Sequence, residues 1–98
     1  MLESALVRKI MTQLESSVGG LWIKISAGPS QVSGLPDIMG CCKARFIGIE
    51  VKVPGKEKTL RPLQALWLLK INNAGGLGFM TTSVEEAVRK VRNFTEGG

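Results

Sequence analysis

Histidine is absent from the 98-residue sequence, and cysteine occurs only twice, at two adjacent positions. Without histidine the chain cannot form a His-ligated zinc site, a Ser-His-Asp triad or a Cys-His dyad. Because neighbouring residues on a strand point to opposite faces, Cys41 and Cys42 are poorly placed for a structural clamp, and neither a CxxC motif nor a metal-binding spacing is present. We interpret both as buried free thiols in a reducing compartment.

Long apolar runs are also missing, so the sequence predicts neither a signal sequence nor a membrane span. We therefore expect a cytoplasmic location and no membrane partner. The composition, with 44% hydrophobic and 21% charged residues, is typical of a globular chain rather than a disordered one. Ninety-eight residues suffice for one core, and we treat residues 1–98 as a single domain.

The charge is unbalanced, with thirteen Lys and Arg against eight Asp and Glu and a formal net charge of +5. This excess favours a polyanionic partner, although a soluble basic domain without such a partner explains the charge equally well. Basic residues contact phosphate without reading bases, so a nucleic-acid partner would be bound through its backbone. The candidate phosphate contacts are Lys43, Arg45, Lys56, Lys58 and Arg61, with a second group at Arg89, Lys90 and Arg92.

Hydrophobic periodicity predicts an α/β fold with the order α-β-β-β-α-β-α. The expected helices cover residues 2–17, 61–72 and 83–93, and the expected strands cover residues 21–26, 37–43, 46–53 and 78–82. A short connection at Lys43-Ala44-Arg45 predicts an antiparallel hairpin, and Ser83 with Glu86 predicts a capping box for the last helix. These elements indicate a small mixed sheet flanked by helices.

Two segments stand out within this pattern. The helix at residues 61–72 is apolar on nearly every side, so we expect it to be buried on two fronts, by the sheet and by another element or subunit. The segment from Ala27 to Pro36 is rich in glycine, proline and serine. It is long for a connection in a compact domain, which makes it a candidate functional loop.

Chemistry concentrates on the two strands of the predicted hairpin. Glu50 and Lys52 are two residues apart and share one face of a strand, whereas Ile49, Val51 and Val53 face the other side. Asp37 begins the neighbouring strand. Because adjacent strands lie ~5 Å apart, its carboxylate can reach the same ion as Glu50.

Two carboxylates and a lysine are the groups that metal-assisted phosphodiester hydrolysis requires. Hard carboxylates hold Mg²⁺ or Mn²⁺, whose bound water becomes hydroxide more easily, and a nearby lysine orients that water or balances phosphate charge. The ordinary alternative is that Glu50 and Lys52 are surface strand residues and that Asp37 belongs to a turn. Unpaired charge on strands this rich in apolar residues is costly, which favours the functional interpretation.

The sequence resembles the PD-(D/E)xK nuclease superfamily and, more closely, its virus-type replication-repair nuclease (VRR-Nuc) family. The resemblance covers nearly the whole chain, through "LESAL", "LWIKIS", "GLPDIM", "IGIEVKVPGK" and "RPLQALWLLKINNAGG". It implies a restriction-endonuclease-like core in which Asp37 and Glu50 bind the metal together with the Val51 carbonyl, and Lys52 is the catalytic lysine.

Three further residues match the family less directly. Glu3 matches an acid of the first helix that completes the metal site, although it equally suits a helix N-terminus. Gln64 matches a glutamine beside the catalytic residues, although it also suits a buried polar gap. Lys24 matches a lysine that approaches phosphate, although a solvated strand residue is an equal alternative. Residues 26–33 depart from the shorter family loop.

The resemblance implies a structure-selective endodeoxyribonuclease that cuts Holliday junctions or other branched DNA as a two-fold homodimer. For a phage-encoded protein the location would be the host cytoplasm. Two alternatives stay open at this point. A non-catalytic DNA-binding module would share the basic surface without needing Asp37, Glu50 and Lys52 together. An RNA-directed or general phosphodiesterase would share the site but not the substrate.

Overall fold

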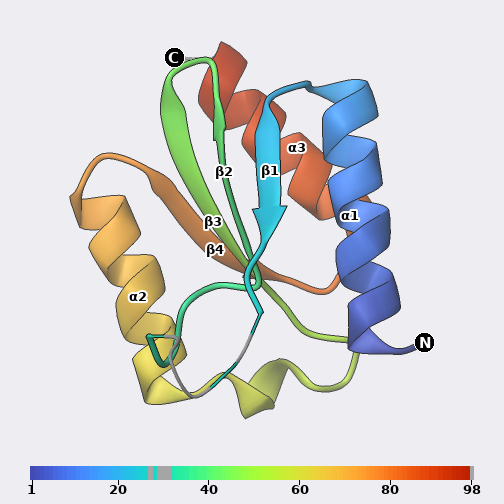
Figure 1. The fold of residues 1–98 in the computed structure, drawn as a ribbon, viewed down its shortest axis with the longest axis vertical. Coiled ribbons are helices and arrows are strands. Elements are labelled where there is room, and N and C mark those ends of the chain that lie inside the picture. The colour runs from blue at the N-terminus through green and yellow to red at the C-terminus, as the bar shows by residue number, and fades with distance from the viewer. Residues whose placement is uncertain (27, 29–31, 98) are drawn as a thin grey trace.

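A mixed four-stranded sheet with helices on both faces forms the molecule (Figure 1). The computed structural model describes residues 1–26, 28 and 32–97. Its elements are α1 (Glu3–Ser17), β1 (Leu21–Lys24), β2 (Ile38–Cys42), β3 (Arg45–Val51), the short 3-10 helix η1 (Glu57–Thr59), α2 (Pro62–Asn73), β4 (Leu77–Thr81) and α3 (Val84–Glu96). The predicted mixed sheet flanked by helices is confirmed.

The sheet has the strand order β1-β2-β3-β4, in which the first two pairs are antiparallel and β3 and β4 are parallel. A two-residue turn at Lys43 and Ala44 joins β2 to β3, and both residues have positive φ, 51° and 65°. Positive φ at both central positions defines a type I′ turn, whose twist matches that of the flanking strands. The predicted antiparallel hairpin is therefore confirmed, with Arg45 already in β3.

One face of the sheet is covered by α1 and α3. Ile38, Ile47, Ile49 and Val51 alternate with outward positions along β2 and β3, and all four are 0% exposed. The helices contribute further fully buried core residues, including Ile10, Leu14, Ala87 and Val91. This face holds the apolar core.

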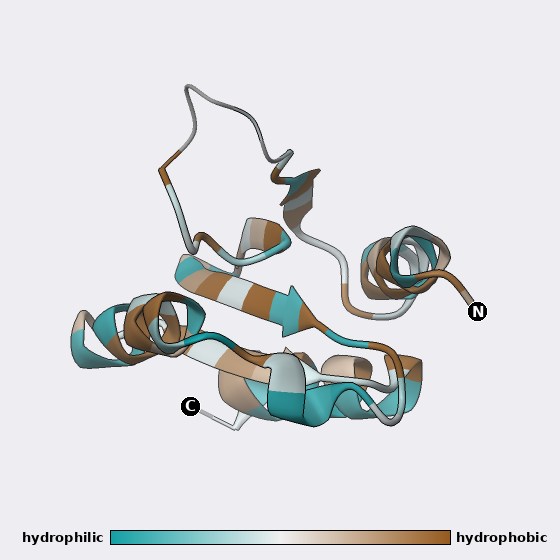
Figure 2. Ribbon diagram, turned by 90° about the horizontal axis from the view of Figure 1, so that it is seen from below, coloured by the Kyte–Doolittle hydropathy of each residue, from teal (hydrophilic) through white to brown (hydrophobic). Residues whose placement is uncertain are grey.

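The opposite face is covered by α2, which lies across the sheet from α1 (Figure 2). Two strand glycines allow the close approach. A Cβ at Gly48 would lie 2.5 Å from Ile71 Cδ1, and one at Gly78 would lie 2.6 Å from the Leu68 carbonyl oxygen. Any larger residue at either position would push the helix outward.

Only one side of α2 is buried, through Leu68 and Ile71. Leu63, Leu66 and Leu69 remain 44%, 43% and 53% exposed. The expectation of burial on two fronts is therefore wrong for the described chain by itself, because one sheet covers only one side of a helix. A second cover would have to come from a partner.

Both cysteines are free, but only Cys42 is buried. The prediction of a buried thiol is therefore confirmed for Cys42 and wrong for Cys41, which is exposed.

Of the predicted functional loop, residues 27 and 29–31 lie outside the described part of the chain. Its later part contacts α2, since Trp67 Nε1 donates to the Ser33 carbonyl at 3.0 Å. None of the described helices is long and apolar enough to cross a membrane.

Candidate active site

The hairpin register brings Asp37 opposite Glu50. The last paired residues are Ile38 and Ile49, so one further step along the ladder faces Asp37 with Glu50. In a two-residue hairpin the pair next to the turn exchanges hydrogen bonds and the pairs then alternate, which makes this position a non-hydrogen-bonded one. Side chains approach most closely at such positions. The two carboxylates therefore share one face at short range.

Asp37 is held on both sides. Its backbone oxygen accepts a hydrogen bond from Ile25 N at 2.8 Å, which continues the pairing with β1. Its side-chain Oδ2 accepts one from Val51 N at 2.8 Å, which directs the carboxylate toward β3. The predicted meeting of Asp37 with the Glu50 segment is confirmed.

The pairing of β2 with β3 ends before Pro36. Its last pair is Ile38 with Ile49, and Pro36 lies on the α2 face, since a Cβ at Gly48 would be 3.1 Å from Pro36 Cγ. The Val51 N–H donates to the Asp37 carboxylate at this point. The role of the Val51 carbonyl as a metal ligand stays a prediction.

Glu50 is the most constrained member of the cluster, with only 2% of its surface exposed. Its Oε2 accepts a hydrogen bond from Gln64 Nε2 at 3.0 Å and lies 3.5 Å from Lys52 Nζ. Its Oε1 is buried and has no hydrogen-bond partner among the described residues. One carboxylate oxygen is thus satisfied by protein and the other is not.

Burial raises the pKa of Glu50 to about 7, and the negative charge of Asp37 adds to this effect. The Lys52 ammonium opposes it through its charge and hydrogen bond, and the Glu3 carboxylate raises the Glu50 pKa further by a smaller amount. Paired acids in a dry site commonly resist ionisation in this way. The site is therefore short of positive charge.

Gln64 connects α2 to the cluster. Its Oε1 accepts a hydrogen bond from Arg61 N at 2.9 Å, so the side chain caps the first turn of the helix, while its Nε2 donates to Glu50. One amide therefore fixes both the start of α2 and the orientation of the carboxylate. The predicted position of Gln64 beside Glu50 is confirmed.

Lys52 lies just past the end of β3, on the same face as Glu50. Only 7% of its surface is exposed, and its backbone N–H donates to the Thr81 carbonyl at 3.0 Å, which ties it to the end of β4. A buried lysine requires a negative partner, and Glu50 provides one.

Glu3 lies nearby but outside the close cluster. It is the first residue of α1, it is exposed, and it has the smallest influence on the Glu50 pKa. Within residues 1–26, 28 and 32–97, no three His, Cys, Asp or Glu side chains gather closely enough to form a metal-binding group.

The predicted phosphate-binding residues are divided by the fold. Lys56, Lys58 and Arg61 lie in the exposed segment between Lys52 and α2, at the end of the sheet that carries the site. Lys24 lies at the same end but on the other face, because it pairs with the core residue Ile38.

Lys43 and Arg45 lie at the hairpin turn, at the opposite end of the sheet from Asp37 and Glu50. Lys43 Nζ is 3.5 Å from the Glu96 carboxylate, and the Arg45 guanidinium is 4.9 Å from the centre of the Phe94 ring. The structure therefore does not bring these two residues to the cluster.

On the last helix, Arg89 and Arg92 line a groove between α1 and α3, whereas Lys90 lies over the Phe79 ring at 5.1 Å. Arg8 and Lys9 line the same groove from α1, which the sequence did not indicate. Their helical positions were predictable, but only the packing of α1 against α3 brings the two pairs of cations together.

Comparison with models of protein families and with curated protein sequences finds no match for this chain. Two carboxylates and a buried lysine converge, and one carboxylate oxygen has no partner among the described residues. Such an arrangement can accept a hard cation and can position a water molecule beside it.

Proposed function

We propose that the chain is a divalent-metal-dependent endodeoxyribonuclease with a PD-(D/E)xK-type core similar to that of the VRR-Nuc family. The observation that carries the proposal is Glu50 Oε1, which is buried beside a second carboxylate with no partner in the part of the chain that the structure describes. An unpaired buried oxygen costs roughly 1–3 kcal/mol, and more when it is charged. A bound cation would remove that cost and lower the pKa of Glu50.

The available donors fit Mg²⁺ or Mn²⁺. Asp37 and Glu50 supply carboxylate oxygens and Val51 supplies a carbonyl oxygen, which are the hard ligands that these ions prefer. Glu3, at the start of α1, would complete the set directly or through a bound water. When present, the ion would polarise the phosphate and make its water more acidic.

The protein residues would then have separate tasks. Lys52 would hold the attacking water or a non-bridging phosphate oxygen, since its ammonium lies 3.5 Å from Glu50 and is shielded from solvent. Gln64 would keep the Glu50 carboxylate oriented. Lys56, Lys58 and Arg61 would hold the DNA backbone on the exposed side of the site, without base contacts.

Branched DNA, such as a Holliday junction, is the proposed substrate, with a homodimer as the active form. A pair of cuts on opposite strands needs two sites related by a two-fold axis. The exposed leucines of α2, at positions 63, 66 and 69, supply an apolar stripe that a second copy would cover. The free thiols agree with a cytoplasmic setting.

One cleavage assay tests the activity. Labelled junction, flap, duplex and RNA substrates are incubated with Mg²⁺ or Mn²⁺ and with wild type or Lys52→Ala. We expect wild type to cut branched DNA and Lys52→Ala to lose about 10²–10³-fold in rate, the usual effect of removing a transition-state donor. Lys70→Ala serves as the control, because Lys70 is exposed on α2 and lies over the Trp67 ring instead of the site.

The alternatives give different results in the same assay. If wild type binds DNA but cuts no substrate with either ion, the chain is the non-catalytic DNA-binding module. Cleavage of RNA in preference to DNA would assign the RNA-directed phosphodiesterase instead.

Metal binding is tested separately by titrating Mn²⁺ calorimetrically. Glu50→Gln should weaken binding at least tenfold, because it removes a charged ligand and keeps the shape of the side chain. Glu15→Gln, an exposed change on α1, should leave binding unchanged. Equal Mn²⁺ affinity in wild type and both variants would mean that the ion does not bind at Glu50.

A further inference from the structure

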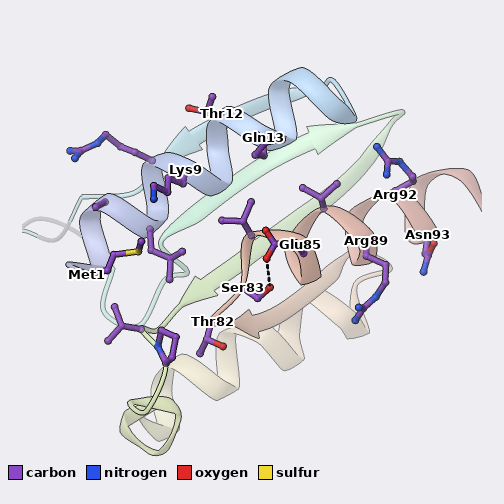
Figure 3. A pocket seen from close by; sticks show the side chains of 17 residues that line it. Met1, Lys9, Thr12, Gln13, Thr82, Ser83, Glu85, Arg89, Arg92 and Asn93 are labelled. Atoms are coloured by element: carbon purple, nitrogen blue, oxygen red, sulfur yellow. Dashed lines mark hydrogen bonds between the residues drawn. The ribbon is translucent and has the colours of Figure 1, made fainter.

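A groove of about 1710 Å³ runs between α1 and α3, on the side of the molecule away from α2 (Figure 3). Its lining residues repeat at helical spacing. On α1 they include residues 5, 8, 9, 12 and 13, and on α3 they include residues 84, 85, 88, 89, 92 and 93. Residues three and four apart lie on one helix face, so each helix presents a continuous wall to the groove.

The charges along these walls are mostly positive. Arg8 and Lys9 belong to the α1 wall and Arg89 and Arg92 to the α3 wall, against Glu85 as the acidic residue of the lining. Figure 3 shows Lys9 and Arg92 on facing helices with Glu85 between them. Arg92 is also fixed in place, since its Nη2 donates to the Ser17 carbonyl at 2.9 Å. The groove is therefore complementary to an anionic partner.

The floor and the width of the groove favour one extended chain. Ala5, Leu6, Val84 and Val88 give the floor an apolar character between the charged walls. Packed helices have axes ~8–10 Å apart and are ~10–12 Å across with their side chains, so the groove follows the seam of α1 and α3 and does not pass between them. One extended nucleic-acid strand can lie along such a seam, with phosphates toward the cations and sugars over the floor.

The groove also opens at the end of the sheet that carries the catalytic cluster. Val53 and Pro54 belong to its lining and follow Lys52 directly, and Thr82, also in the lining, follows the last residue of β4. A strand that leaves the cluster around the end of β3 therefore meets the entrance of the groove without crossing the body of the protein.

We propose that the groove between α1 and α3 binds a single-stranded DNA segment continuous with the strand held at Asp37, Glu50 and Lys52. The choice of DNA rests on the proposed nuclease function, whereas the preference for a single anionic strand rests on the groove. None of the described residues that line the groove is aromatic, so binding depends on the backbone and is independent of base sequence.

The test measures binding without cleavage. A fluorescein-labelled ten-nucleotide oligo-dT is titrated in EDTA and read by fluorescence anisotropy, with wild type, Lys9→Glu/Arg89→Glu and the control Lys43→Glu/Lys70→Glu. Both double variants change the net charge equally, but the control residues lie at the hairpin turn and on α2. Thermal melting verifies that each variant is folded.

We expect the groove variant to bind about tenfold or more weakly than wild type, with a salt dependence shallower by about 1–1.5 in log–log slope. The control should stay within about threefold of wild type. In ¹H–¹⁵N spectra, the oligonucleotide should shift the amides of residues 5–13 and 84–93 ahead of those in α2. Lys9→Ala/Arg89→Ala should give a smaller loss in the same direction.

Equal losses in the two double variants, or shifts centred on α2 or the hairpin, would overturn the inference. So would tighter binding of a poly-glutamate peptide than of oligo-dT, since the partner would then be an acidic protein segment. The outcome is independent of the nuclease proposal. If the groove binds the strand and no substrate is ever cut, the proposed activity fails alone, and if junctions are cut while the groove variant binds normally, this inference fails alone.

Discussion

The two faces of the sheet differ in what covers them and in what they bury. The face under α1 and α3 buries isoleucines and valine completely, whereas the face under α2 buries Glu50 and Lys52 and leaves Leu66 43% exposed. Buried charge and exposed leucine both cost free energy. The apolar face therefore supplies the stability that allows the other face to bury a charged cluster.

The largest expected effect comes from replacing leucine by alanine on each of the two faces of the sheet. Leu14→Ala removes a side chain that is 0% exposed, and Leu66→Ala removes one that is 43% exposed. We expect Leu14→Ala to lower the free energy of unfolding by about 3–5 kcal/mol and Leu66→Ala to lower that of the monomer by less than about 1 kcal/mol. Urea unfolding at low protein concentration measures both, and comparable losses would contradict the division between the faces.

The second prediction concerns pH in the metal-free protein. The pKa of Glu50 rises from 4.5 to about 7 on folding, so the folded state binds a proton that the unfolded state releases. The Glu50 contribution is therefore fully present below pH 4.5 and is lost as pH rises through 7, by on the order of 3 kcal/mol.

Wild type should lose this stability between pH 5 and 8 relative to Glu50→Gln, which cannot titrate. Urea unfolding of both proteins in EDTA isolates the difference, because their other groups are shared. Saturating Mg²⁺ should reverse the trend in wild type only. Parallel profiles for the two proteins would mean that Glu50 ionises normally in the fold.

The third prediction tests whether the open side of α2 is an interface. Leu66→Lys should raise the dissociation constant of the homodimer at least tenfold, because it inserts a charge into an apolar contact. Sedimentation equilibrium measures the change. Glu15→Lys, an exposed change on α1 away from the α2 stripe, is the charged control. A wild-type monomer at micromolar concentration would remove the paired-cut proposal.

The smallest expected effect acts on both faces alike. Ala44 has a φ of 65°, a conformation that favours glycine, and it lies in the turn that sets the register of β2 against β3. Ala44→Gly should raise the free energy of unfolding by roughly 0.5–1 kcal/mol and leave metal affinity unchanged. A thermal melt with and without Mn²⁺ distinguishes this from an effect on the cluster.

Much of this site was predictable because strand geometry is local. The two-residue period places Glu50 and Lys52 on one face, and a short turn forces the segment of Asp37 to pair beside them. Gln64 was found by resemblance, and its second bond, to Arg61 N, needed the exact start of α2.

What the sequence could not predict are the features that depend on packing between distant elements. The composition of α2 predicts that every side of the helix is buried. Whether its exposed leucines are covered depends on a second molecule, about which the sequence of one chain gives no information. Lys43 and Lys56 are equally basic, but the length of the hairpin separates the first from the cluster. The groove cations on α1 and α3 gather only because those helices pack together.

The double use of Gln64 has a consequence for hydrogen exchange. The Arg61 amide proton is protected by Gln64 Oε1, while the other end of the same side chain donates to Glu50. Rotation of that side chain exposes the proton to solvent and deprives the carboxylate of its donor in a single event. The deuterium uptake of one backbone amide at the start of α2 therefore reports how often the buried acid is released, and it should slow when a cation immobilises Glu50.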